Sequence, residues 1–253
     1  MDRDHTPLVL IKPQWPAPPG VMAGCTTRLG GLSQGNYQGL NLAQHVGDEA
    51  GAVLANRQRL LEAFNFPHAP QWLNQVHGIQ VHEINQAQVL PSVISADASF
   101  TRQGDQVCAV LTADCLPLLV CDEAGSVVAA IHAGWRGLAA GIISTTIKAM
   151  DKPAASLLVW LGPAIGPRAF EVGDDVYQTF TRVHAGNAQA FSPGENGRWW
   201  ANLYELARLQ LFRLGVLQIY GGEYCTYTQA ELFYSYRREN QTGRMASFIW
   251  REQ

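Results

Sequence analysis

The sequence predicts a layered α/β or α+β fold, a single domain in which helices flank a mixed β-sheet. Several short runs rich in valine, leucine and isoleucine have the length and composition of buried strands. Longer segments between them carry apolar residues at helical spacing. At least two strands are joined by a direct hairpin, which makes the sheet mixed rather than strictly parallel.

Helical and strand patterns follow one another along the chain. The first helix is expected over residues 48–64, where two acidic residues favour its start. Further helices are expected over 135–150, 173–183 and 202–214, and Gly215 provides the left-handed cap that ends the last one. Strands are expected over 107–111, 116–121, 126–132, 157–161 and 216–220. Residues 71–84 are typical of a strand interrupted at Gly78.

One domain accounts for the whole chain, residues 1–253. The chain is 47% hydrophobic, which is enough for a substantial core. It has no repeat and no low-complexity tract, and its proline-rich stretch, 12–20, lies too near the start to link two domains. Residues 1–20 are therefore expected to form an irregular amino-terminal segment of that domain.

The charge and the cysteines exclude several classes of protein. With 21 acidic and 18 basic side chains the net charge is −3, so we expect no nucleic-acid partner. No apolar run reaches the roughly 18 residues of a membrane span, and acidic residues stand where a signal peptide would be basic. We expect a cytoplasmic monomer or weak homodimer. The five cysteines form no Cys-x-x-Cys pair, which argues against a disulfide framework.

A hairpin in residues 112–132 carries the first candidate for chemistry. If its turn lies at 122–125, Cys115 stands directly opposite His132, and one metal ion could bridge the thiolate and the imidazole. A third ligand must come from elsewhere. His77 and His82 are the candidates, and because they are five apart on a strand they point to opposite faces. The alternative is that Cys115 and His132 are ordinary interior residues.

Two glycine-containing loops could bind an anion. Residues 133–141 lead into a helix whose amino end should lie beside His132, and Arg136 adds a charge there. The alternative is a tight turn that needs glycine only for its geometry. Residues 26–31 could present Arg28 to a phosphate or carboxylate, and the alternative is a solvated surface loop.

Several segments together resemble one known family. They are Gln75-Val-His-Gly, Ala113-Asp-Cys-Leu-Pro, His132-Ala-Gly-Trp-Arg-Gly, Leu161-Gly-Pro-Ala-Ile-Gly, Cys225-Thr, Phe233-Tyr-Ser-Tyr-Arg-Arg and Gly243-Arg. In this order they resemble the bacterial YfiH, or laccase-domain, family, also labelled multicopper polyphenol oxidase-like. The resemblance covers the chain from about residue 20 to its end. It implies a layered α/β fold similar to that of cysteine hydrolases.

The resemblance also implies a function and a ligand set. Family members are similar to purine nucleoside phosphorylases that convert adenosine, inosine, guanosine or methylthioadenosine plus phosphate into base and sugar phosphate, with additional adenosine deaminase activity. The family's zinc ligands carry over to His77, Cys115 and His132. Zinc with three protein ligands keeps a fourth position open, as catalytic zinc does.

Further residues receive roles as hypotheses. A carboxylate must move protons during deamination, and Asp114 and Asp97 are the candidates. Phosphorolysis needs an anion pocket, which Arg136 and Arg28 could supply. Asn41 and Arg237 are candidate binders of the sugar or the base.

Three other interpretations remain open. Cys115 could act as a nucleophile with His132 as its base, or zinc could act in its place, in an amidase that edits peptidoglycan precursors. A four-copper laccase needs His-x-His pairs, which this chain lacks, but two histidines and a cysteine could bind copper in vitro and give weak polyphenol oxidase activity. A non-catalytic protein with structural zinc would need a fourth ligand, for which His45 is the candidate.

Overall fold

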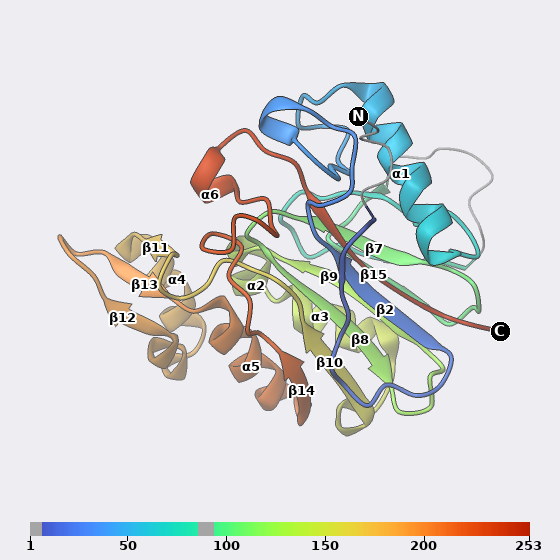
Figure 1. Cartoon of the computed structure of the whole chain (residues 1–253). Coiled ribbons are helices and arrows are strands. Elements are labelled where there is room, and N and C mark those ends of the chain that lie inside the picture. Colours follow the sequence, from blue (N-terminus) through green and yellow to red (C-terminus); the bar gives the residue numbers. More distant parts are fainter. Residues whose placement is uncertain (1–6, 86–93) are drawn as a thin grey trace.

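The computed structural model describes residues 7–85 and 94–253, which form a mixed α/β fold with several sheets (Figure 1). The largest sheet has six strands in the order β14-β10-β8-β9-β6-β4. These strands span Gln218–Gly221, Leu157–Leu161, Leu116–Asp122, Val128–Ala133, Ala98–Thr101 and Val81–Glu83. The pairs β10–β14 and β4–β6 are parallel and the others antiparallel, so the expected mixed sheet is present.

A second sheet, which the sequence did not predict, packs against the first. Its four strands, in the order β1-β2-β15-β7, span Leu10–Ile11, Val21–Thr26, Met245–Arg251 and Cys108–Thr112. The strand expected over 107–111 is thus real, but it belongs to this sheet. Two smaller sheets join β3 (Leu73–Asn74) to β5 (Ile94–Ser95), and β11 (Glu171–Val172) to β13 (Trp199–Ala201) and β12 (Phe191–Pro193).

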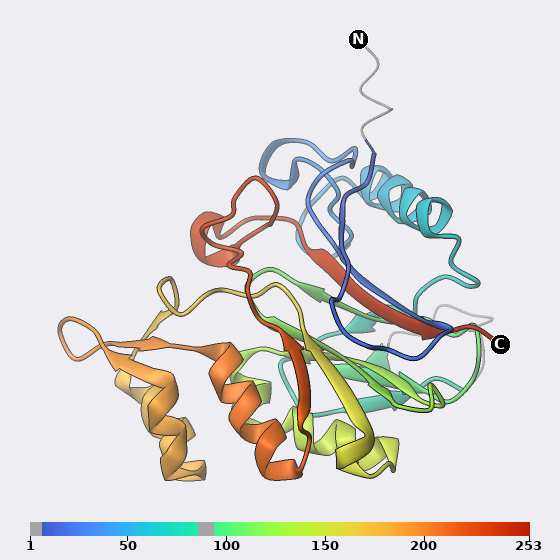
Figure 2. The same cartoon turned by 60° about the horizontal axis from the view of Figure 1, so that its bottom comes forward.

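The main elements stack in four layers, which Figure 2 shows edge-on. Helix α1 (Ala50–Phe64) covers the outer face of the four-stranded sheet, whose inner face packs on the six-stranded sheet. The other face of the six-stranded sheet is covered by helices α2 (Trp135–Ala140), α3 (Ile142–Met150) and α5 (Leu203–Leu214). The short α6 (Tyr236–Glu239) and α4 (Asp174–Val183) lie at the end of the molecule away from the carboxyl terminus.

Period-two alternation in the strands builds the cores between these layers. In β8, Leu118 and Val120 pack toward the helices, whereas Leu119 and Cys121 pack toward the second sheet. The central strands are therefore buried on both faces, which explains why they are continuous apolar runs in the sequence. No helix in the described ranges is long and apolar enough to cross a membrane.

Two of the predicted helices have different bounds in the structure. The helix expected over 135–150 is two helices, because Gly141 adopts a left-handed conformation with φ 99° and ends the first of them. The first helix begins at Ala50, and its cap is Glu49, whose carboxylate accepts the N–H groups of Gly51 and Ala52. Gly215 ends α5 in the left-handed conformation that the sequence predicted.

The hairpin register was predicted wrongly by two residues. Pro117, not Cys115, stands opposite His132. The cause is the loop: the Asp122 carboxylate accepts the N–H groups of Ser126 and Val127, and this local network makes the turn wider than expected. The segment 71–84 is likewise not one strand, because β3 ends at Asn74 and β4 begins at Val81.

Candidate active site

The structure brings His77, Cys115 and His132 together, with one ligand atom of each within 4.8 Å of the others. His132 lies in β9, and Cys115 directly precedes β8. His77 lies in the turn between β3 and β4, where it adopts a left-handed backbone with φ 58°. The Cys115 Sγ lies 3.8 Å from the His77 Nε2, and the two imidazole rings meet edge to face. His82 stands on β4 and takes no part in this group.

Asp97, just before β6, organises two of these three residues. Its Oδ1 accepts hydrogen bonds from the His77 backbone N–H (2.9 Å) and the His132 Nδ1 (2.8 Å). Its Oδ2 accepts the N–H groups of Gly78 (2.7 Å) and Val76 (3.3 Å). The fully buried carboxylate therefore holds the turn that carries His77 and leaves the Nε2 of His132 free to face the group.

Asp114 fixes the position of the segment that carries Cys115. Its φ of 87° turns the chain just before Cys115, which lies beyond the end of the hairpin ladder. Its carboxylate accepts the hydroxyls of Thr226 (2.6 Å) and Ser235 (3.0 Å) and the backbone N–H of Arg237 (2.7 Å). Asp114 thus ties the segment around Cys115 to the start of α6, more than 100 residues later.

The three ligand residues are strongly coupled electrostatically. Burial alone would raise the pKa of the Cys115 thiol, but the charge and hydrogen bonds of His132 and His77 lower it to about 6. Burial would lower the pKa of His132, but the Cys115 thiolate and the Asp97 carboxylate raise it to about 9. Without a metal ion, the group therefore holds a thiolate beside an imidazolium.

The donor set fits a metal ion. A tetrahedral zinc ion with Zn–S and Zn–N bonds of about 2.3 and 2.0 Å separates sulfur from nitrogen by roughly 3.5 Å, close to the 3.8 Å between Cys115 and His77. The space is kept open by Gly134, where an added Cβ would lie 3.0 Å from the Cys115 Sγ and 3.6 Å from the His132 Nε2. The residues present therefore match a three-ligand site.

The group opens into a cavity of about 460 Å³, a size typical of small-molecule sites. Its apolar wall includes Trp135, Ile165, Phe170 and Leu203. Three arginines, Arg136, Arg237 and Arg244, also line the cavity, as do His45, Gln75, Asp114 and Tyr236. The cavity lining therefore combines apolar side chains with three positive charges.

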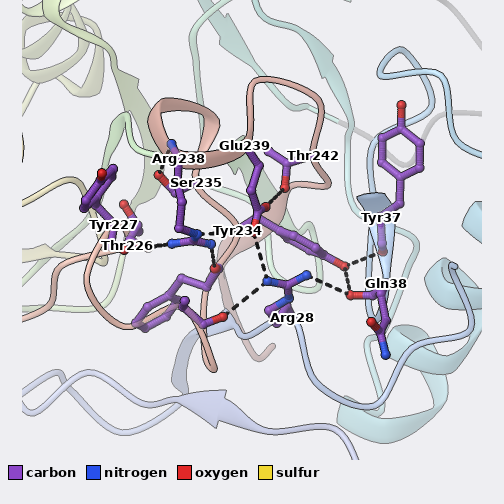
Figure 3. Close-up of polar contacts among 12 residues, drawn as sticks. Arg28, Tyr37, Gln38, Thr226, Tyr227, Tyr234, Ser235, Arg238, Glu239 and Thr242 are labelled. Atoms are coloured by element: carbon purple, nitrogen blue, oxygen red, sulfur yellow. Dashed lines mark hydrogen bonds and ion pairs between the residues drawn. The ribbon is translucent and has the colours of Figure 1, made fainter. Parts of the chain in front are cut away.

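Two of the residues predicted to bind substrate lie elsewhere. Arg28 donates to the carbonyls of Ala230 and Gln38, pairs with Glu239 at 3.6 Å and lies over the ring of Tyr234 (Figure 3). This network lies outside the cavity that contains Cys115.

Asn41 is fully buried, and its amide hydrogen-bonds to the backbone of Ala43 and Arg244 and to the Asp48 carboxylate. The cavity wall therefore contains neither of these two residues.

The cavity is also lined by Gln75, Tyr236 and Arg244, for which the sequence predicted no role. Gln75 holds the site through its amide, which accepts the Leu111 N–H and donates to the Leu111 carbonyl. All three lie within the segments that carry the family resemblance, and this position was the one sign in the sequence that they belong to the site. His45 lines the cavity but is not part of the ligand group.

The fold and the His–Cys–His group define a mixed α/β protein in which three residues that could hold a metal ion line a cavity with three arginines. Residues 22–252 match the family described as multi-copper polyphenol oxidoreductase laccase, and the chain belongs to that family. The family resemblance noted from the sequence is thus confirmed.

Relatives in this family cover almost the whole chain. It is 50% identical over 241 residues to the Shigella flexneri protein named purine nucleoside phosphorylase YfiH, covering 95% of this chain and 98% of the relative. It is 49% identical to the Pseudomonas aeruginosa protein named purine nucleoside phosphorylase PA4543, covering 95% and 97%.

Solved structures agree with the fold. A Neisseria meningitidis protein is 48% identical with a TM-score of 0.92, covering 96% of this chain and 99% of that one. YlmD from Geobacillus stearothermophilus is 32% identical with a TM-score of 0.88, covering 96% of both.

Proposed function

We propose that this protein is a zinc-dependent purine nucleoside phosphorylase that also deaminates adenosine. The observation that carries the proposal is that the His77–Cys115–His132 group opens into a cavity lined by apolar side chains and three arginines. The names of the close relatives support the phosphorylase activity. Its substrates would be adenosine, inosine, guanosine and methylthioadenosine, with orthophosphate as the second substrate.

Zinc suits the donor set because one thiolate and two imidazoles are its common ligands, and three protein ligands leave a position open. When bound, zinc supplies Lewis acidity at the inner end of the cavity. The chain prepares the ligands: His132 is held in one tautomer by Asp97, and the Cys115 thiol ionises readily because its pKa is low.

In phosphorolysis a phosphate oxygen bonds to C1′ of the sugar while the C1′–N bond breaks. The purine leaves with that electron pair and takes up a proton. The sugar becomes positively charged in the transition state, so an anion fixed beside it is stabilising. Arg136 and Arg237 supply positive charge at the cavity, and the apolar wall that includes Phe170 accepts the purine.

In deamination water adds to C6 of adenine and ammonia leaves, which requires proton transfers. Asp97 and Asp114 were the carboxylates that the sequence offered for this task. Each already accepts three or four hydrogen bonds from the protein, and Asp97 is fully buried. We therefore assign both a positioning role, with Asp97 orienting His132 and Asp114 anchoring α6.

The test combines metal content with product analysis. Protein purified without added metal is analysed for bound zinc and copper and then incubated with adenosine, with and without phosphate. We expect about one zinc per chain. Without phosphate, adenosine should give inosine and ammonia; with phosphate, it should give adenine, ribose 1-phosphate and ammonia, with hypoxanthine from cleavage of the inosine formed. Cys115→Ala should lose metal and both activities, whereas His82→Ala, the matched control on β4, should keep them. Zinc-free native protein that cleaves no nucleoside would overturn the proposal.

A second candidate is a cysteine-dependent amidase acting on peptidoglycan precursors. One observation favours it: Cys115, His132 and Asp97 are arranged as nucleophile, base and orienting carboxylate, and the thiol has a low pKa. In that case the metal-free protein would be active and rapidly inactivated by alkylation at Cys115. Zinc would then inhibit the reaction rather than support it.

Copper is the third possibility for the same ligands, since two imidazoles and a thiolate also bind copper. Weak polyphenol oxidation would then require copper loading. If protein as isolated holds zinc and oxidises a phenol only after exchange of zinc for copper, the oxidase activity belongs to the substituted metal.

A further inference from the structure

The three cavity arginines share an arrangement that points to a ligand. Each guanidinium lies over an aromatic ring: Arg136 over Trp135 (4.5 Å), Arg237 over Phe170 (5.3 Å) and Arg244 over Tyr236 (5.9 Å). Within residues 7–85 and 94–253, none of the three forms an ion pair with a carboxylate. The cavity lining therefore carries three positive charges that no carboxylate in the described ranges pairs with directly, an arrangement that favours an anionic ligand.

Arg244 is the most enclosed of the three, because Arg136 and Arg237 are exposed and Arg244 is half-buried. Its Nη1 donates to the carbonyls of Thr242 (2.7 Å) and Gly243 (3.0 Å), which uses both hydrogens of that nitrogen and sets the plane of the guanidinium. Its Nε and Nη2 make no hydrogen bond to the described part of the chain. These two nitrogens form one edge of the fork that binds oxyanions in a bidentate manner.

Arg238, a structural arginine near Arg244 in the sequence, differs from it in its hydrogen-bond partners. Arg238 donates through Nη1 to the Thr226 and Tyr227 carbonyls, through Nη2 to the Phe233 carbonyl and through Nε to the Glu239 carboxylate (Figure 3). Every nitrogen of Arg238 thus has a partner within the protein. Arg244 has protein partners on one nitrogen only among the described residues, and it lines the cavity.

The surroundings of Arg244 place it near the ligand group. Burial lowers its pKa, while the charges of Cys115 and Asp114 raise it, so both lie within electrostatic range. His45 lines the same cavity, and burial together with the charges of Arg244 and Arg57 lowers its pKa. This direction favours the neutral imidazole, which can hydrogen-bond to an anion held by Arg244 without adding charge.

We propose that Arg244 is the principal orthophosphate-binding residue of the cavity, with its Nε and Nη2 edge donating to two phosphate oxygens and His45 beside it. The identity of the oxyanion as phosphate rests on the proposed phosphorylase function. Arg136 and Arg237, which are exposed, attract the anion to the cavity, and Arg244 holds it next to the ligand group.

The test measures phosphate binding directly and then in turnover. Calorimetric titration with inorganic phosphate compares native protein, Arg244→Gln, Arg244→Lys and Arg182→Gln, all purified with their metal. Arg182 is an exposed arginine of α4 outside the cavity, so its variant controls for the loss of one positive charge. The backbone N–H and carbonyl of Arg244 pair with Asn41 and Leu42 and are unaffected by the substitution, so thermal unfolding should show intact variants.

We expect Arg244→Gln to weaken phosphate binding about 10- to 100-fold, as loss of a bidentate ionic contact does. Arg244→Lys should lie between native and Gln, because an ammonium keeps the charge but not the fork. Arg182→Gln should bind as the native protein does. In turnover, the KM for phosphate should rise by the same factor while the KM for the nucleoside stays within about twofold.

Other outcomes separate this proposal from the proposed function. Nucleoside cleavage with an unchanged phosphate KM in Arg244→Gln would overturn the role of Arg244 and leave the phosphorylase intact. Phosphate binding that depends on Arg244 without any nucleoside cleavage would retain the subsite and overturn the phosphorylase. If the native protein binds no phosphate at millimolar concentration, the subsite is wrong whatever the reaction is.

Discussion

Replacing Asp97 with asparagine tests how the ligand group is held. The carboxylate accepts four hydrogen bonds, two on each oxygen, and asparagine has the same shape but only one accepting oxygen. If the new NH₂ faces Val76 and Gly78, the turn that carries His77 loses its anchor. If it faces His132, Nδ1 must accept, and the ring proton moves to Nε2, which then cannot bind a metal ion.

The first orientation loses two hydrogen bonds to a buried anion, each worth about 1.5–3 kcal/mol; the second loses the one from the His77 N–H, and the reversed bond to His132 is no longer ionic. Allowing for relaxation, we expect Asp97→Asn to lower the free energy of unfolding by about 3 kcal/mol and the zinc affinity about 10- to 100-fold. Urea unfolding of the metal-free protein measures the first quantity, and competition with a chromophoric zinc chelator measures the second.

The matched control is Asp151→Asn. Asp151 is exposed and has a left-handed backbone with φ 50°, which asparagine tolerates. This variant should lie within about 0.5 kcal/mol of native and bind zinc normally. If Asp97→Asn also matches the native protein in both assays, the carboxylate does not organise the site and the argument fails.

Three further predictions concern other parts of the molecule. Burial would raise the pKa of Asp122, but its turn hydrogen bonds and Lys152 lower it, so its stabilising effect is present above about pH 4 and lost as pH falls through the folded-state pKa. Urea unfolding should show Asp122→Asn less stable than native at pH 7, with the difference shrinking by pH 3. Gly134→Ala should reduce zinc affinity at least tenfold in chelator competition, because the new methyl group would crowd the Cys115 sulfur. Leu118→Ala, fully buried, should cost about 3 kcal/mol in urea unfolding, whereas the exposed Leu217→Ala should cost under about 0.5 kcal/mol.

The sequence predicted the bounds of an element correctly where its apolar pattern matches the way in which the element is buried in the fold. The strand Leu157–Leu161 has the predicted bounds because an apolar run buried on both faces is visible in the sequence. The division of the strands between two sheets was not visible, because the pairing of β7 with β15 joins residues more than 130 positions apart. Helical spacing also continues across Gly141, so the break there depends on a backbone angle that spacing does not reveal.

The ligand pair on the hairpin was found by an argument that was partly wrong. The predicted register placed Cys115 opposite His132, but the turn network of Asp122 shifts the register by two residues. Cys115 still reaches His132 because the chain turns at Asp114, beyond the paired region. Hairpin geometry alone therefore brought Cys115 and His132 together correctly but with the wrong strand register. The family resemblance was needed to choose His77 over His82.

Asp97 and Asp114 show why residue type alone is a poor guide to role. Both carboxylates lie near the ligand residues, so the sequence favoured them as proton carriers. The structure gives each a full set of donors from segments far away in the chain: Asp97 binds the turn of His77, and Asp114 binds the start of α6. Burial alone would raise the pKa of Asp97, but the hydrogen bonds from His132, Gly78 and His77 and the charge of His132 lower it, so this carboxylate is stabilised as an anion. His45 also lines the cavity, and burial together with the charges of Arg244 and Arg57 lowers its pKa, so the proposed deamination would have a titratable group there besides the two carboxylates.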